Sequence, residues 1–272
     1  MTVKTFFRAL ARPLLGDPDL RLQRMIFREA EGAFTLEQSA FPERLSLPSP
    51  YGRGLPERVV ELVLAHSTYS PGARVLDVGH SNIMECHRRF LTTLVQPRHL
   101  TGIDIASPEY DTRVYYERSI MGDITDTGLP SFSFDLIWCV STLEHVGMDN
   151  SVYTENFVRR TGMDATALAE MVRLLAPGGL LLVTVPFGRY EDHGWFRNYD
   201  RATWTDLLST VRPGVKVSEL YFGYQPDRGW EAVEASSLSS TGYKTYSNAG
   251  AAGLAAAVFR RARASNEKET HQ

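Results

Sequence analysis

The stretch RVLDVGHSNI, residues 74–83, begins as an apolar run and turns at Gly79. The apolar run predicts a buried strand, because strands covered on both faces of a sheet are apolar throughout. The glycine predicts a turn in which main-chain N–H groups approach a ligand closely. A loop that binds the pyrophosphate of a dinucleotide continues with further glycines, whereas this one continues with HSNI. We therefore predict a cofactor turn that does not bind a phosphate group.

Helical and strand-like stretches alternate along the rest of the chain. Helical periodicity predicts helices within residues 57–67, 83–95, 164–179 and 200–211. Apolar runs predict further strands within residues 99–105, 115–124, 134–141, 180–187, 215–224 and 254–262. The third helix is expected to stop at Pro177-Gly178-Gly179, and Asp200 to cap the fourth. The alternation predicts an α/β fold with a mostly parallel, seven-stranded, doubly wound sheet and helices on both faces.

The composition narrows the class of protein. A net charge of -3 argues against a nucleic-acid partner, because binding phosphates needs a basic surface. Cys86 and Cys139 lie far apart, so we expect neither a disulfide nor a zinc site and place the protein in the reducing cytoplasm. Arg8 and Arg12 interrupt the apolar run near the N-terminus, which argues against a signal peptide or a membrane span.

Polar residues follow the predicted strands where those strands end. They are Asp77 and the His80-Ser81 turn, Asp104, Asp123, and the group Ser141, Glu144 and His145. Ligands of parallel sheets bind at the carboxyl ends of the strands, so we expect these side chains to meet there. A carboxylate at the tip of the second strand can accept hydrogen bonds from a ribose diol. An Asp followed by an Ile can bind the amine and the face of a purine.

In this order and spacing the chain resembles the class I S-adenosylmethionine-dependent methyltransferases, over roughly residues 55–190. The stretches that carry the resemblance are RVLDVG, GIDI, GDI, LPSFSFDLIWCVSTLEHV and MVRLLAPGGLLLVTVP. The resemblance implies S-adenosylmethionine as cofactor. By this resemblance, Gly79, His80 and Ser81 would contact the methionine end of the cofactor, and Asp77 would organise the loop. Asp104 would bind the ribose, with Ile105 beside the adenine. Asp123 and Ile124 would hold the adenine, and Ser141 would lie near the sulfonium group.

The resemblance also suggests how the chain is divided. We predict an N-terminal helical extension or cap at 1–54, a methyltransferase domain at 55–263 and a flexible tail at 264–272. Within the domain, two loops near 189–200 and 225–250 are expected to meet the substrate. A homo-oligomer is also possible.

The acceptor is the least defined part of the prediction. The Asn/Asp-Pro-Pro-Tyr/Phe sequence of enzymes that methylate base amines or glutamine amides is replaced here by STLE, residues 141–144. We predict O-methylation of a small molecule or a sugar or glycan unit, with His145 or His193 as the base. Substrate contacts are expected from Glu144, Tyr190, Trp195, Arg197 and Tyr199.

Three alternatives stay open at this point. The enzyme could methylate nitrogen or carbon of a small metabolite, or the chain could be an inactive partner subunit that only binds the cofactor. A divalent metal is a minority hypothesis, because acidic residues and histidines follow the fourth and fifth strands without a recognisable ligand spacing. The prediction is therefore that no metal is bound.

Overall fold

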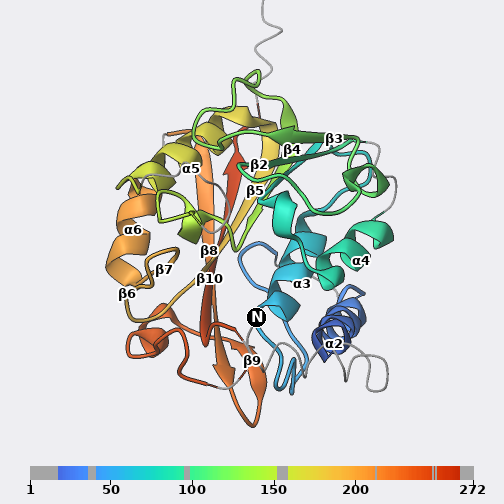
Figure 1. The fold of residues 1–272 in the computed structure, drawn as a ribbon. Coiled ribbons are helices and arrows are strands. Elements are labelled where there is room, and N and C mark those ends of the chain that lie inside the picture. Colours follow the sequence, from blue (N-terminus) through green and yellow to red (C-terminus); the bar gives the residue numbers. More distant parts are fainter. Residues whose placement is uncertain are drawn as a thin grey trace, which may run out of the picture.

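The computed structural model describes residues 18–35, 41–94, 99–151, 159–211, 213–246, 248 and 250–263. Its centre is an eight-stranded sheet in the order β3-β2-β1-β4-β5-β10-β8-β9 (Figure 1). The strands are β1 (Val75–Val78), β2 (Leu100–Asp104), β3 (Arg118–Met121), β4 (Phe134–Val140), β5 (Leu175–Pro186), β8 (Val215–Gln225), β9 (Gly229–Ala232) and β10 (Gly253–Arg261). The five strands from β3 to β5 pair in parallel, and the other three pair antiparallel.

The predicted fold class is confirmed, with one strand more than the predicted seven. The extra strand, β9, lies in the segment 225–250, which we had assigned to a loop. It pairs with β8 through a tight turn at residues 226–228, and Trp230 within it is fully buried. The predicted alternation of strands and helices did not reveal β9, because its sequence, GWEA, contains no apolar run.

Helices cover both faces of the sheet. Figure 1 shows α3 (Arg58–Thr68) and α4 (Glu85–Thr93) on one side, and α5 (Met163–Leu174) and α6 (Arg201–Ser209) on the other. Each side has its own apolar core, with Trp138 and Phe90 in one and Trp204 in the other. Asp200 caps α6 as predicted, because its carboxylate accepts from the main-chain N–H of Thr203 at 2.9 Å.

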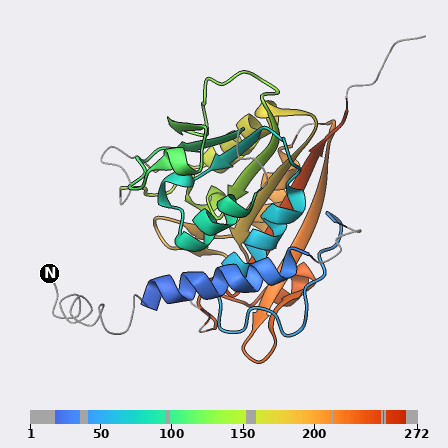
Figure 2. The same ribbon diagram turned by 90° about the vertical axis from the view of Figure 1, so that its right-hand side faces the viewer.

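The N-terminal part is only partly helical. Helix α2 (Pro18–Ala33) packs against α3 and α4, on the same side of the sheet (Figure 2). Residues 41–57, which include the end of the predicted helical extension 1–54, form turns and extended chain. The Pro- and Gly-rich composition of this stretch explains the difference. Residues 1–17 and the predicted tail 264–272 lie outside the described residues.

We had predicted that a helix stops at Pro177-Gly178-Gly179, but these residues do not end a helix. Helix α5 ends at Leu174, and these three residues lie inside β5. The pairing of β5 with β4 is irregular here, since Phe134 faces Leu175 while Leu136 faces Leu180. The extra residues form a bulge, and glycine and proline are tolerated in a strand at such a place.

The order of the strands reverses at β1, which pairs with β2 on one side and with β4 on the other. This is the topological switch point, where the carboxyl ends of neighbouring strands open a crevice. The short hairpin β6 (Glu191–Asp192) and β7 (Arg197–Asn198) is formed by the segment that follows β5. Within the described ranges, no helix is both long and apolar enough to cross a membrane.

Candidate active site

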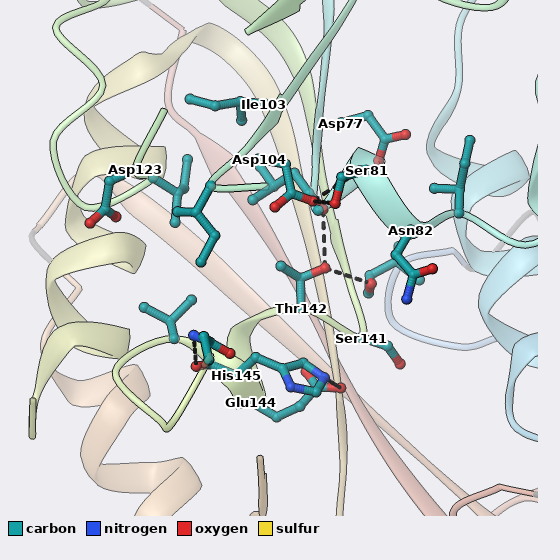
Figure 3. A pocket seen from close by; sticks show the side chains of 18 of the residues that line it. Asp77, Ser81, Asn82, Ile103, Asp104, Asp123, Ser141, Thr142, Glu144 and His145 are labelled. Carbon is teal, nitrogen blue, oxygen red and sulfur yellow. Dashed lines mark hydrogen bonds and ion pairs between the residues drawn. The ribbon is translucent and has the colours of Figure 1, made fainter. Parts of the chain in front are cut away.

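A cavity of about 520 Å³ opens at the carboxyl ends of β1, β2 and β4 (Figure 3). Eleven of the predicted site residues line it: Asp77, Gly79, Ser81, Asp104, Ile105, Asp123, Ile124, Ser141, Glu144, His145 and Trp195. The convergence follows from the parallel sheet, which brings loops far apart in the sequence to one edge.

Gly79 allows the turn after β1 to approach the end of β4. Its φ of 91° lies in the left-handed region, and a Cβ atom there would meet Thr142 Oγ1 at 2.2 Å. The Thr142 hydroxyl is held in place by main-chain oxygens, at 3.1 Å from Val78 and 3.0 Å from Val140. A side chain at position 79 would therefore push the turn away from the crevice.

Asp104, at the end of β2, holds the same turn from the other side. Its Oδ2 accepts from the N–H of Ser81 at 2.9 Å and from the Ser81 hydroxyl at 2.6 Å. Its Oδ1 accepts from the N–H of Ala106 at 3.1 Å. The serine that replaces a second glycine in the sequence thus ties the β1 turn to the tip of β2.

Asp77 and His80 have structural partners beneath the turn. Asp77 is buried and accepts from the Tyr116 hydroxyl at 2.5 Å, with His87 Nε2 at 3.3 Å. His80 is also buried and does not line the cavity, contrary to the expected contact with the cofactor. Its Nε2 lies 2.6 Å from Ser119 Oγ.

The absence of a side chain on Gly102 makes room for the His80 ring. A Cβ atom on Gly102 would lie 2.4 Å from His80 Cδ2. The ring therefore packs against β2 and does not line the cavity.

Asp123 and Ile124 lie beyond Asp104 on the cavity wall. Figure 3 shows Asp104 between Asp123 and Ser81. Asp123 is exposed and accepts from the N–H and the hydroxyl of Thr125, both at 2.8 Å, while Ile124 is buried. The wall therefore offers two carboxylates, Asp104 and Asp123, and the apolar side chain of Ile124.

Ser141 lies at the end of β4 in a left-handed conformation, with a φ of 43°. Its hydroxyl donates to Glu61 Oε1 at 2.6 Å, which also accepts from the Thr184 hydroxyl at 2.7 Å. Arg58 pairs with the other oxygen of Glu61 at 2.8 Å. The Ser141 side chain thus connects the cavity wall to a buried charged cluster on α3.

Many residues of the cavity lining were not predicted from the sequence, and Glu57, Arg58 and Tyr243 are among them. Glu57 and Arg58 stand at the start of α3, and Tyr243 comes from the segment 225–250. Burial raises the pKa of Glu57, and the nearby Glu61 adds to the effect. The Nε atom of Arg58 is buried and has no hydrogen-bond partner among the described residues. No local pattern distinguishes these residues from ordinary helix-start or loop residues.

His145 and Glu144 lie side by side in the turn after β4 (Figure 3). His145 Nδ1 is 2.9 Å from the main-chain oxygen of Trp195, and its Nε2 is 3.9 Å from Glu144 Oε1. Burial lowers the pKa of His145, so its neutral form is favoured. Glu144 is 4% exposed, and burial together with Glu61 raises its pKa well above the ordinary value.

Four other predicted residues do not line the cavity. His193 stacks on Phe196 and has its Nε2 3.1 Å from Glu191, on the hairpin β6-β7. Arg197 and Tyr199 both donate to the buried Asp164, at 2.9 Å each. The fourth, Tyr190, is exposed.

The aromatic density of the segment 189–200 therefore serves mainly to fix the hairpin. Its Trp195 reaches the cavity. In the described parts of the chain, no three His, Cys, Asp or Glu residues gather as a metal site, and Cys86 and Cys139 are free thiols.

A family model matches the central part of the chain. The model, described as a methyltransferase domain, matches residues 84–183, from the start of α4 to β5. The match supports the predicted resemblance to the S-adenosylmethionine-dependent methyltransferases over this part of the chain. S-adenosylmethionine is the cofactor that this resemblance implies. No curated protein sequence matches the chain.

Solved methyltransferase structures are similar to this one. The 1,6-didemethyltoxoflavin-N1-methyltransferase of Burkholderia thailandensis is 15% identical, with 75% of this chain and 77% of that chain covered and a TM-score of 0.49. The N-methyltransferase NodS of Bradyrhizobium japonicum WM9 is 15% identical, with coverages of 87% and 98% and a TM-score of 0.46. The CurJ carbon methyltransferase is 15% identical, with coverages of 96% and 72% and a TM-score of 0.48.

The lining of the cavity can be tested for its fit to this cofactor. Two carboxylates and a buried isoleucine suit an adenosine. The buried, unpartnered Nε of Arg58 is a donor for a carboxylate such as that of the methionine end. The residues present therefore fit S-adenosylmethionine.

Proposed function

We propose that this methyltransferase transfers the methyl group to a hydroxyl of a small molecule, such as a sugar or a glycan unit, with His145 as the general base. The observation that carries the proposal is the contact between His145 Nδ1 and the main-chain oxygen of Trp195. A carbonyl oxygen only accepts, so the ring carries its proton on Nδ1. The lone pair of the neutral ring is then on Nε2.

The lowered pKa of His145 supports this role. A base must be neutral before it accepts a proton, and a histidine with a pKa below its usual value of about 6.5 is neutral at physiological pH. His145 Nε2 takes the proton of the acceptor hydroxyl as its oxygen becomes bonded to the methyl carbon. His193 is the weaker candidate, because it lies outside the cavity lining.

The cofactor supplies the electrophilic methyl group when it is bound. We propose that Asp104 accepts from a ribose hydroxyl, because three contacts leave one of about four acceptor positions on its carboxylate. The Ser81 hydroxyl beside it is the partner for the second ribose hydroxyl. Asp123 and Ile124 would hold the adenine, and Arg58 the methionine carboxylate.

The acceptor then occupies the part of the cavity next to His145. Trp195 and Tyr243 provide aromatic surface there, and Glu144 and Asn150 provide polar atoms. Aromatic faces combined with a few polar groups are typical of sites for polyhydroxylated small molecules. The predicted substrate loops would contribute through these two aromatic residues.

The test is methyl transfer from a labelled cofactor to a panel of sugars and simple alcohols, with the methylated atom identified by NMR. His145→Ala at saturating cofactor is expected to lower kcat by about 10²–10⁴-fold, the usual contribution of a general base. His193→Ala is the matched control and is expected to keep its turnover. If His145→Ala keeps the full kcat, His145 is not the general base.

A further inference from the structure

Three glutamates gather around one arginine, and two of them, Glu57 and Glu144, line the cavity together with the arginine. Glu57 and Arg58 begin α3, Glu61 follows one turn later, and Glu144 comes from the turn after β4. Glu61 and Glu144 are 0% and 4% exposed. Buried carboxylates are stable only when they are neutral or paired, so the partners of each one decide what the cavity can bind.

Two of the three carboxylates have their partners within the chain. Glu61 accepts from the hydroxyls of Ser141 and Thr184 and pairs with Arg58. Glu57 accepts from the main-chain N–H of Ala251 at 2.8 Å. These contacts fix the two side chains to the protein.

Glu144 differs from them. Its Oε2 is buried and has no hydrogen-bond partner among the described residues, and its side chain lines the cavity. Its other oxygen is 3.9 Å from His145 Nε2, which is beyond a hydrogen bond. A buried polar atom that has no partner and lines a cavity is a candidate to bind a group of a ligand.

An ammonium group is the ligand that satisfies such a carboxylate best. It supplies up to three N–H donors and a positive charge, and a hydrogen bond between charged groups is about twice as strong as a neutral one. Arg58 forms its ion pair with Glu61, and no ion pair joins Arg58 to Glu144 among the described residues. A hydroxyl would satisfy one lone pair but would leave the excess of acidic groups uncompensated.

We propose that the acceptor carries an amine close to the hydroxyl that is methylated, and that Glu144 binds this amine as an ammonium. The inference rests on the proposed function, since His145 is the group that receives the hydroxyl proton. The 3.9 Å between His145 Nε2 and Glu144 Oε1 places the two functional groups on neighbouring atoms of one molecule. The substrate class is therefore an amino alcohol, such as an amino sugar.

Glucosamine and glucose form a matched pair of probes, because they differ by one amine in place of one hydroxyl. We would measure the binding of each by calorimetry with S-adenosylhomocysteine at saturation. The full chain, Glu144→Gln and the control Glu219→Gln, a carboxylate on β8 outside the cavity, would be compared. A thermal melt of each variant shows that it is folded.

The wild type and the control are expected to bind glucosamine about 10- to 100-fold more tightly than glucose, and Glu144→Gln is expected to lose this preference. If the wild type binds glucosamine no more tightly than glucose, the amine subsite is overturned. This includes the case in which both sugars bind weakly. The affinity of Glu144→Gln for S-adenosylhomocysteine is expected to be unchanged. A tenfold loss would assign Glu144 to the amine of the cofactor and would also overturn the proposal.

The position of the methyl group separates this inference from the proposed function. A methyl group on a sugar oxygen with equal binding of the two sugars would contradict the amine subsite alone. A methyl group on the nitrogen of glucosamine would contradict both, because the amine would then be the acceptor.

Discussion

His145 and Trp195, fifty residues apart, are joined where the hairpin β6-β7 meets the end of β4. His145 Nδ1 lies 2.9 Å from the Trp195 main-chain oxygen, and their rings lie 5.0 Å apart. The hairpin thereby fixes both the orientation and the proton position of the imidazole. The base of the proposed reaction is thus prepared by a segment that itself lies next to the acceptor site.

The rate is expected to depend on pH through His145. Protonation of the ring removes the base, so kcat/KM should fall as the pH is lowered. Because burial lowers the pKa of His145, the acidic limb should lie below the ordinary imidazole value of about 6.5. A pH–rate profile measures this limb. A limb at higher pH than the ordinary value, or one that persists in His145→Gln, would contradict the assignment.

Asp104→Ala is expected to weaken binding of S-adenosylhomocysteine by about 1–3 kcal/mol, the cost of leaving a buried polar group without its partner. Ser81→Ala keeps the carboxylate and should lose less. Calorimetry measures both affinities. Asp111→Ala is a control, because Asp111 pairs with Arg113 on an exposed turn. Unchanged affinity of Asp104→Ala would mean that the ribose lies elsewhere.

Gly79 and Gly72 offer a matched pair of substitutions. Both have positive φ, 91° and 81°, but only at Gly79 does a Cβ atom meet Thr142, whereas nothing lies within 4 Å at Gly72. Each change to Ala should cost about 1–2 kcal/mol for the left-handed conformation. Gly79→Ala should cost a further 1–3 kcal/mol, roughly the penalty of overpacking.

Denaturant unfolding measures both costs, and calorimetry measures cofactor affinity. Gly79→Ala should also weaken cofactor binding, since the turn moves. Equal stability losses for the two variants, with unchanged cofactor affinity, would show that the close approach to Thr142 has no role.

Glu144 should make the stability of the ligand-free protein depend on pH. Its pKa is raised well above 4.5 in the folded state, so the folded protein binds more protons than the unfolded chain above that pH. Its contribution to stability is complete below pH 4.5 and is lost as the pH rises through the folded-state pKa. Glu144→Gln should therefore gain stability relative to the wild type between about pH 5 and pH 8. Denaturant unfolding measures the free energy of unfolding of both proteins at each pH. The same pH dependence for the wild type and Glu144→Gln would contradict this prediction.

Local sequence patterns predicted most of the sheet, because its central strands are apolar runs bounded by turns. The patterns failed where strand pairing competed with them. Pro177, Gly178 and Gly179 have the composition of a helix stop, yet the ladder between β4 and β5 includes them as a bulge. A Cβ atom on Gly179 would lie 2.9 Å from the main-chain oxygen of Asp135. The glycine therefore allows β5 to approach β4 closely at the bulge.

The site was predictable only where it follows the strands. Asp104 and His145 could be placed because the carboxyl ends of parallel strands converge. Arg58 and Tyr243 could not, because their positions depend on how α3 and the segment 225–250 pack on the sheet. The predicted contact of His80 with the cofactor failed for a related reason. The His80 ring occupies the space that Gly102 leaves in the neighbouring strand, so it does not line the cavity.

The central claim is that the cavity holds S-adenosylmethionine with its sulfur toward His145. A crystal structure with S-adenosylhomocysteine bound tests it most directly. We predict that the ribose hydroxyls contact Asp104, that the adenine lies against Ile124, and that the sulfur faces the space between His145 and Glu144. A ligand in this cavity with its sulfur turned away from His145, or a ligand bound outside it, would contradict the account.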